Sequence, residues 1–156
     1  MTPREAKTIG RRKTIKATAV IIAILLIVFM IQETRGDFAN GILFYIQDIT
    51  NIHTIAVLTI LFGFTFLFGG MAGKEIILDK KNFIVISIKY LVPITLSSYF
   101  YLAIVGLINA PPDFPKNIKF ASTYYLIPLA QRFLWLFIPM LAAWLWATYQ
   151  MRLKMN

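Results

Sequence analysis

Apolar residues in this chain gather into four long runs that short polar stretches separate. The runs lie at about residues 14–32, 54–72, 90–108 and 126–148. A helix of about 19 residues rises about 28 Å, which matches the hydrocarbon thickness of a bilayer. Backbone amides in hydrocarbon have no water to pair with, so we predict that each run is a membrane-spanning α-helix.

Composition supports lipid as the solvent. The chain is 58% hydrophobic and only 15% charged, whereas a soluble domain has about 25% charged residues. A small soluble domain needs a charged surface to stay dispersed. The sequence therefore predicts an all-α membrane protein, with residues 1–156 forming a single transmembrane domain.

Basic residues divide unequally between the two sides that the spans define. Eleven fall on the side of both termini and three on the other. Lys and Arg are enriched in cytoplasmic loops, so we predict that both termini are cytoplasmic, in a cell membrane of the bacterial inner-membrane type. The eleven are Arg4, Lys7, Arg11, Arg12, Lys13, Lys16, Lys74, Lys80, Lys81, Arg152 and Lys154, and the three are Arg35, Lys116 and Lys119.

The basic N-terminus could also precede a secretory signal peptide or bind nucleic acid, given the net charge of +9. Residues 32–37 offer no small-x-small cleavage site, so we interpret the first run as an uncleaved span. No aromatic residues are interleaved with the cations, which favours contact with membrane lipid over nucleic acid.

Residues 37–52 predict an amphipathic helix on the outer face, between the first two spans. Apolar residues recur there at spacings of three and four, with polar residues between them and Asp37 as a possible N-cap. Two interpretations stay open for this segment. It is either a docking surface for a partner or a lid over the helix bundle.

Residue types exclude several kinds of chemistry. The chain has no cysteine and one histidine, His53, so we expect no disulfide, no metal site and no cofactor. No nucleophile–base pair or phosphate-binding loop stands in the sequence, and we predict that the chain is not an enzyme. The spans carry no carboxylate, which argues against an ion-coupled transporter.

Arg132, with Gln131 beside it, is the candidate binding residue. An arginine inside an apolar run normally faces protein or water and has a partner. One hypothesis is that Arg132 and Gln131 contact an anionic group of a substrate or of another subunit. In the alternative, the last span begins near Phe133 and Arg132 lies at the outer headgroups.

Gly69 and Gly73 form a small-x-x-x-small pair in the second apolar run. Such pairs let two helix backbones approach closely in lipid. The pattern allows packing within the chain, which we favour, or contact with a second copy.

The last run carries a family resemblance. Residues 129–139 begin with Leu-Ala-Gln-Arg-Phe-Leu-Trp and end at Pro139, and Tyr149 and Gln150 follow at the end of the helix. This stretch resembles the last helix of small four-span proteins encoded beside exosortases, membrane enzymes that sort proteins for the cell envelope. The resemblance implies an accessory protein, and such companions have no diagnostic catalytic motif.

These observations predict a non-catalytic accessory or interaction subunit of a larger membrane complex, in envelope protein sorting. Its expected partners are membrane lipid and either a larger membrane protein or a second copy of the chain. Two alternatives stay open: a homo-oligomeric channel or carrier, and an immunity-type protein that blocks a pore-forming toxin.

Overall fold

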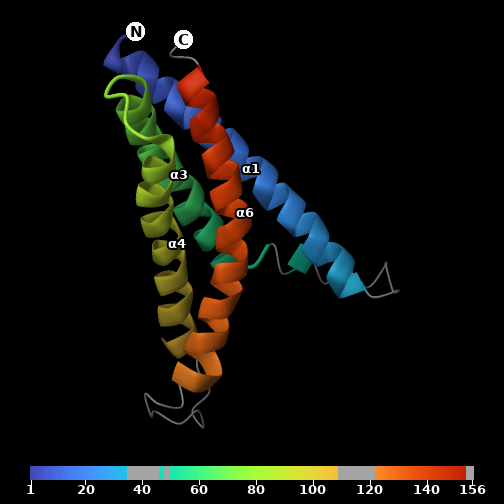
Figure 1. The fold of residues 1–156 in the computed structure, drawn as a ribbon. Coiled ribbons are helices and arrows are strands. Elements are labelled where there is room, and N and C mark those ends of the chain that lie inside the picture. Colours follow the sequence, from blue (N-terminus) through green and yellow to red (C-terminus); the bar gives the residue numbers. More distant parts are fainter. Residues whose placement is uncertain (35–45, 48–49, 109–121, 154–156) are drawn as a thin grey trace.

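A computed structural model describes residues 1–34, 46–47, 50–108 and 122–153. Every regular element in this part of the chain is helical (Figure 1). The α-helices are α1 (Pro3–Thr34), α3 (Ile52–Ile77), α4 (Phe83–Ile108) and α6 (Ile127–Arg152), and a π-helical segment, η1 (Ser122–Leu126), leads directly into α6.

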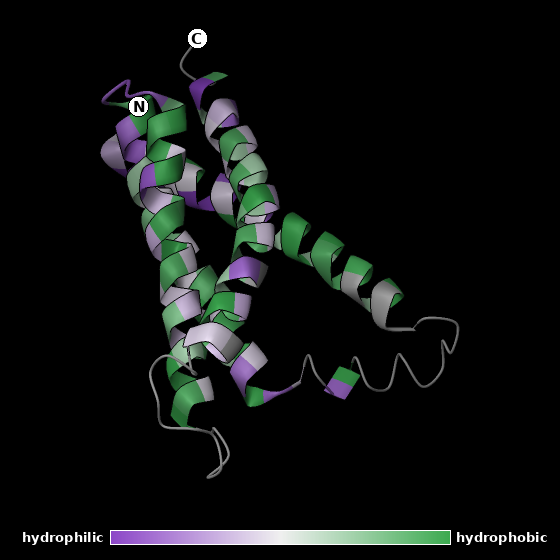
Figure 2. Cartoon of the chain, turned by 60° about the horizontal axis from the view of Figure 1, so that its bottom comes forward, coloured by the Kyte–Doolittle hydropathy of each residue, from purple (hydrophilic) through white to green (hydrophobic). Residues whose placement is uncertain are grey.

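Within the described residues, α3, α4 and α6 are each long and apolar enough to cross a membrane, with mean hydropathies of 2.1, 1.9 and 1.3 over their most apolar stretches. They lie lengthwise beside one another (Figure 1). Most of their apolar side chains face outward, which lipid tolerates and water does not. Figure 2 shows hydrophobic residues along most of each helix and hydrophilic residues gathered near both termini. The fold is that of a helical membrane protein.

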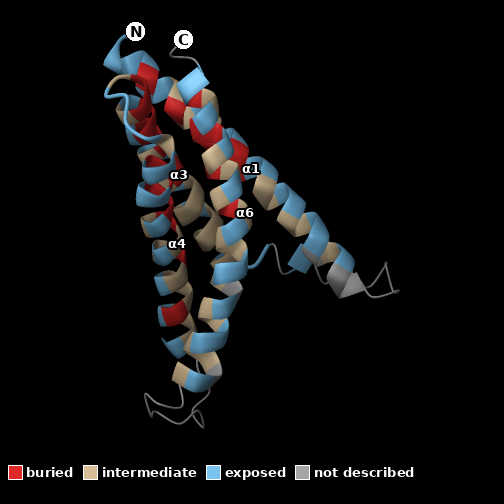
Figure 3. Cartoon of the chain, viewed as in Figure 1, coloured by how far each residue is buried: buried red, intermediate tan, exposed pale blue. Residues whose placement is uncertain are grey.

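The first helix has two different halves. Its N-terminal half packs on α3 and α6, and its C-terminal half diverges from the other helices (Figures 1 and 3). Thr18 is the last buried residue of α1 that the structure describes. Although residues 19–31 are apolar, each of those with a described side chain is exposed or only partly buried.

The buried core lies toward the end of the molecule that holds both termini (Figure 3). Trp144 of α6 is its largest fully buried side chain. Tyr90 stacks on Phe68 with ring centroids 5.4 Å apart, which joins α4 to α3. The other large, fully buried apolar side chains come from α3, α4 and α6, and they are Ile76, Ile86, Leu91, Ile94 and Met151.

The helices extend past the predicted spans at the end that holds the termini. The basic residues expected to precede the first helix lie inside α1, which begins at Pro3 rather than near Thr14. A capping box begins it: Thr2 N–H donates to Glu5 Oε2 at 2.8 Å, and Glu5 N–H donates to Thr2 Oγ1 at 3.3 Å. The first of these bonds lowers the pKa of the Glu5 carboxyl. Hydropathy marks the part of a helix that suits lipid, and the polar continuation follows from capping and packing.

The predicted outer amphipathic helix, residues 37–52, falls mostly outside the described residues. Ile46 and Gln47 are helical, and Thr50 N–H donates to Ile46 O at 3.0 Å. Asn51 then caps α3, because its Oδ1 accepts from His53 N–H at 2.9 Å.

Candidate functional site

The close contact between α1 and α3 is made by glycines. A methyl group placed on Gly10 would lie 2.7 Å from Gly73 Cα and would overlap the carbonyl oxygen of Gly69. The predicted packing residues Gly69 and Gly73 thus face α1 of the same chain. On α1 a small residue recurs every four positions, through Ala6, Gly10, Thr14 and Thr18. The two backbones therefore touch, which brings many atoms into dispersion contact.

Two polar pairs hold α6 in place around this crossing. The Trp144 indole Nε1–H donates to Thr18 Oγ1 at 3.2 Å, and both side chains are fully buried. Ser87 of α4 and Thr148 of α6 share a hydrogen bond of 2.7 Å. Each pair joins two helices inside an apolar surrounding, where an unpaired donor would be costly. The N-terminal half of α1 is thus fixed to two neighbours.

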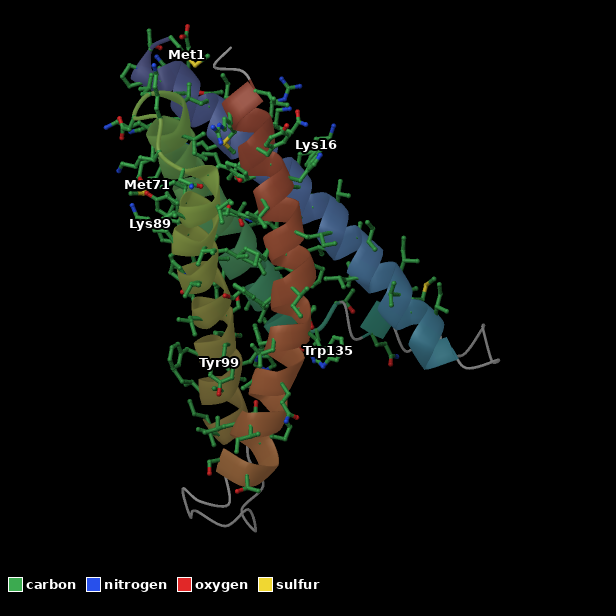
Figure 4. The ribbon with its side chains drawn as sticks, in the orientation of Figure 1. Met1, Lys16, Met71, Lys89, Tyr99 and Trp135 are labelled. Carbon is green, nitrogen blue, oxygen red and sulfur yellow. The ribbon has the colours of Figure 1, made fainter. Side chains whose placement is uncertain are left out.

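Beyond Thr18, the exposed half of α1 (residues 19–31) presents a large apolar surface. Val20, Ile24, Ile27 and Ile31 are between 49% and 61% exposed. Trp135 of α6 is 78% exposed, and Figure 4 shows its side chain projecting from α6 on the side toward which α1 diverges. Large apolar side chains exposed on helices that suit lipid can bind lipid or another helix.

A single carboxylate joins α3 to α4 at the end that holds the termini. Glu75 accepts hydrogen bonds from Lys81 Nζ at 3.0 Å, Lys89 Nζ at 2.8 Å and the Tyr90 hydroxyl at 2.5 Å. Both lysines are about half exposed. The turn between the helices includes Lys80 in the left-handed region, at φ 52°. The cluster stabilises a helical hairpin, because its groups form hydrogen bonds and salt bridges with one another.

Arg132 and Gln131 lie in the second turn of α6, toward the end of the molecule away from the termini. Gln131 is exposed, and the side chain of Arg132 lies outside the described residues. The described acidic side chains, Glu5, Glu75 and Asp79, all lie at the opposite end. The structure therefore brings none of these three acids to Arg132. The helix itself begins at Ile127, six positions before Phe133.

An apolar groove of about 400 Å³ runs between α4 and α6 beside these residues. Tyr99 and Thr95 are its only polar lining residues among those described. The groove faces outward along two helices whose apolar surfaces suit lipid. Its remaining lining residues are Val92, Leu96, Ala130, Phe133, Leu134 and Phe137.

Tyrosines join α4 to η1 and α3 at the far end, which the sequence analysis missed. The Tyr125 hydroxyl donates to Leu102 O at 2.8 Å, and its ring fills the space beside Gly106, where a Cβ would overlap it. The Tyr101 hydroxyl lies 3.2 Å from His53 Nδ1. Gly106 within an apolar run was the available signal, because a helical glycine often marks a close approach.

Among the described residues, no group of three His, Asp or Glu side chains could hold a metal ion. No protein-family model matches the chain, and comparison with curated proteins and with solved structures finds no significant match.

Proposed function

We propose that this chain is a non-catalytic accessory subunit that binds a transmembrane helix of a larger membrane protein. It crosses the cell membrane four times and keeps both termini in the cytoplasm. The observation that carries the proposal is the change in α1 at Thr18. The helix is tightly packed before that residue, and after it the described apolar side chains are exposed or only partly buried.

A helix in a closed bundle buries one stripe along its whole length. In α1 the stripe of small residues is buried from Ala6 to Thr18, and no described side chain beyond Thr18 is fully buried, although the apolar run continues to Ile31. The missing contacts are those that a further helix would supply. Trp135, on the side of α6 toward which α1 diverges, is a large, rigid side chain of the kind that dominates binding energy at protein interfaces.

The family resemblance of α6 supports the identity of the larger partner. Arg132, Phe133 and Leu134, then Pro139 and the Tyr149–Gln150 pair, resemble the companions of exosortases. In this proposal the partner supplies the chemistry of envelope protein sorting and this chain supplies a binding surface. Arg132 stands three positions before Trp135 on the same helix, so an acidic group of the partner next to Trp135 would lie within its reach.

A mild-detergent pull-down of tagged protein from its native membrane tests the proposal. We expect a larger membrane protein in stoichiometric amount with the wild type and with Trp146→Ala. We expect its loss with Trp135→Ala and a reduced amount with Arg132→Leu. Trp146 is the matched control, because it lies on the same helix and is 53% exposed.

A photo-crosslinking residue at Ile24 locates the contact, and one at Ile88 of α4 serves as control, since both positions are exposed by similar amounts, 49% and 44%. We expect a protein adduct from Ile24 and lipid adducts from Ile88. Recovery of the chain alone, with lipid adducts at both positions, would overturn the proposal. Adducts between copies of the chain, with solute flux in liposomes, would support a homo-oligomeric channel or carrier instead.

A further inference from the structure

A basic hollow lies on the face of α1 formed by Ile9, Arg12, Lys13 and Lys16, which line a volume of about 320 Å³. Their spacings of three and four positions bring these residues to one face of the helix. Figure 4 shows Lys16 projecting away from the other helices. Three cations thus surround one hollow, which is a concentration of charge that an anion can neutralise.

No acidic side chain among the described residues forms a salt bridge with these cations. In the described part of the chain, the salt bridges join Glu75 to Lys81 and Lys89. Glu5, the acid on α1 nearest the hollow, accepts its hydrogen bond from Thr2. The charges of Arg12, Lys13 and Lys16 are therefore available to a ligand.

Packing on another face of α1 fixes the orientation of the hollow relative to α3. Gly10 and Thr14 pack against α3 on another face of α1, so the helix cannot rotate its cations away. The apolar run begins at Ala17, directly after Lys16. Lipid phosphates lie at the level where a helix passes from hydrocarbon to water, and basic side chains extend to them there.

An apolar strip continues from the hollow along the same face of α1. Ala19, Val20, Ala23 and Ile27 follow Lys16 at spacings of three to four, and all are exposed. A phosphate at the cations would leave an attached acyl chain lying along this strip. A free phosphate ion would use the cations alone.

We propose that this face of α1 binds an anionic phospholipid, with its phosphate on Arg12, Lys13 and Lys16 and an acyl chain along Val20 and Ala23. The site shares Val20 and Ile27 with the apolar surface proposed for the partner helix. Its cations are distinct from that surface, and its test uses purified protein and needs no partner. Titrating purified protein in detergent with dioctanoyl phosphatidylglycerol, followed by native mass spectrometry, measures the affinity. Dioctanoyl phosphatidylcholine and glycerol 3-phosphate are the comparison ligands.

We expect the Arg12→Gln, Lys13→Gln, Lys16→Gln triple variant to bind phosphatidylglycerol at least about tenfold more weakly than wild type. The matched control carries Lys7→Gln, Lys74→Gln and Lys80→Gln, which remove the same charge from exposed positions at the same end. We expect it to bind within about twofold of wild type. The exposed cations contribute little to folding, and unchanged thermal unfolding of both variants verifies this.

Val20→Asn tests the acyl strip. It should weaken the binding of phosphatidylglycerol and leave the affinity for glycerol 3-phosphate unchanged. Equal losses in the two triple variants would overturn the proposal, because binding would then follow net charge alone. Equal affinity for phosphatidylcholine would also overturn it. Glycerol 3-phosphate binding as tightly as the lipid would show an anion site that does not use the apolar strip, and would overturn the lipid assignment.

Discussion

At the crossing of α1 and α3, two residues without side chains decide how close the helices come. Gly10 and Gly73 face each other so closely that a methyl group on either would lie within 2.7 Å of the other's Cα. Helix association in lipid lacks a hydrophobic driving force and depends on such contact. A side chain at either position would push the two helices apart, so the position of α1 depends on these glycines.

We expect Gly73→Leu to separate α1 from α3, with a loss of about 2–3 kcal/mol in the free energy of unfolding, because the opposing atoms are backbone and cannot yield. Gly63→Leu is the control, since a Cβ there meets nothing within 4 Å. Denaturation in mixed micelles measures both variants. Equal losses would show that the effect belongs to glycine in α3 generally and not to the crossing.

The hydrogen bond between Trp144 and Thr18 provides a second test, in which one hydroxyl group is removed. Thr18→Val keeps the side-chain shape and leaves the buried indole N–H without its acceptor, so we expect a loss of about 1 kcal/mol. Thr59→Val should change stability little, because Thr59 is exposed and bonds only to Ile55 O of its own helix. The same denaturation assay compares them. An unchanged Thr18→Val would mean that the indole N–H finds another acceptor.

Among the helices, α3 and α4 are joined at one end by a cluster of charged and polar side chains. Glu75 closes the α3–α4 hairpin by accepting from Lys81, Lys89 and Tyr90. We expect Glu75→Gln to lower the midpoint of thermal unfolding by only about 2 °C, because both lysines are half exposed and water screens the pairs. The difference from wild type should shrink in high salt.

Asp79→Asn is the control for that change, since it removes the same charge from the same hairpin, and Asp79 forms no salt bridge with any described residue. Unfolding followed by circular dichroism at low and high salt gives both comparisons. If Asp79→Asn were as destabilising as Glu75→Gln, the general charge balance of the hairpin would matter more than the Glu75 cluster.

Hydropathy predicts α3, α4 and α6, because an apolar run of sufficient length is enough to indicate a helix that suits lipid. It could not predict where these helices end, since their polar ends are stabilised by caps and packing. It could not predict the partner of Gly73 either. Gly10 lies among basic residues outside the apolar run, and only the four-residue spacing from Ala6 to Thr18 signalled a packing face.

The candidate binding surface was predictable only in part. The sequence singles out Arg132 for its position in an apolar run. From sequence alone, Trp135 would be interpreted as an ordinary aromatic residue at the membrane–water interface. What distinguishes Trp135 is its 78% exposure on the side toward which α1 diverges. Divergence of a helix depends on contacts between distant segments, which the hydropathy of residues 17–31 does not contain.

The molecule as a whole is packed at one end and spread at the other (Figure 3). Both termini and the loop between α3 and α4 lie at the packed end, together with the basic residues of α1. Helices α3, α4 and α6 supply three candidate spans, and the predicted count of four requires that α1 also crosses. An even number of crossings would bring both termini to the same side, which the positive-inside rule predicts to be cytoplasmic.

Single-cysteine variants test this topology without background, because the chain contains no cysteine. A membrane-impermeant maleimide should label Arg35→Cys and Asp113→Cys in intact cells. It should label Thr2→Cys and Lys80→Cys only after the membrane is opened, because those positions are cytoplasmic in the predicted orientation. Thr2→Cys and Arg35→Cys stand on either side of the apolar run of α1. If both reacted from the same side, α1 would lie along the membrane surface, and its exposed half could not bind a transmembrane helix.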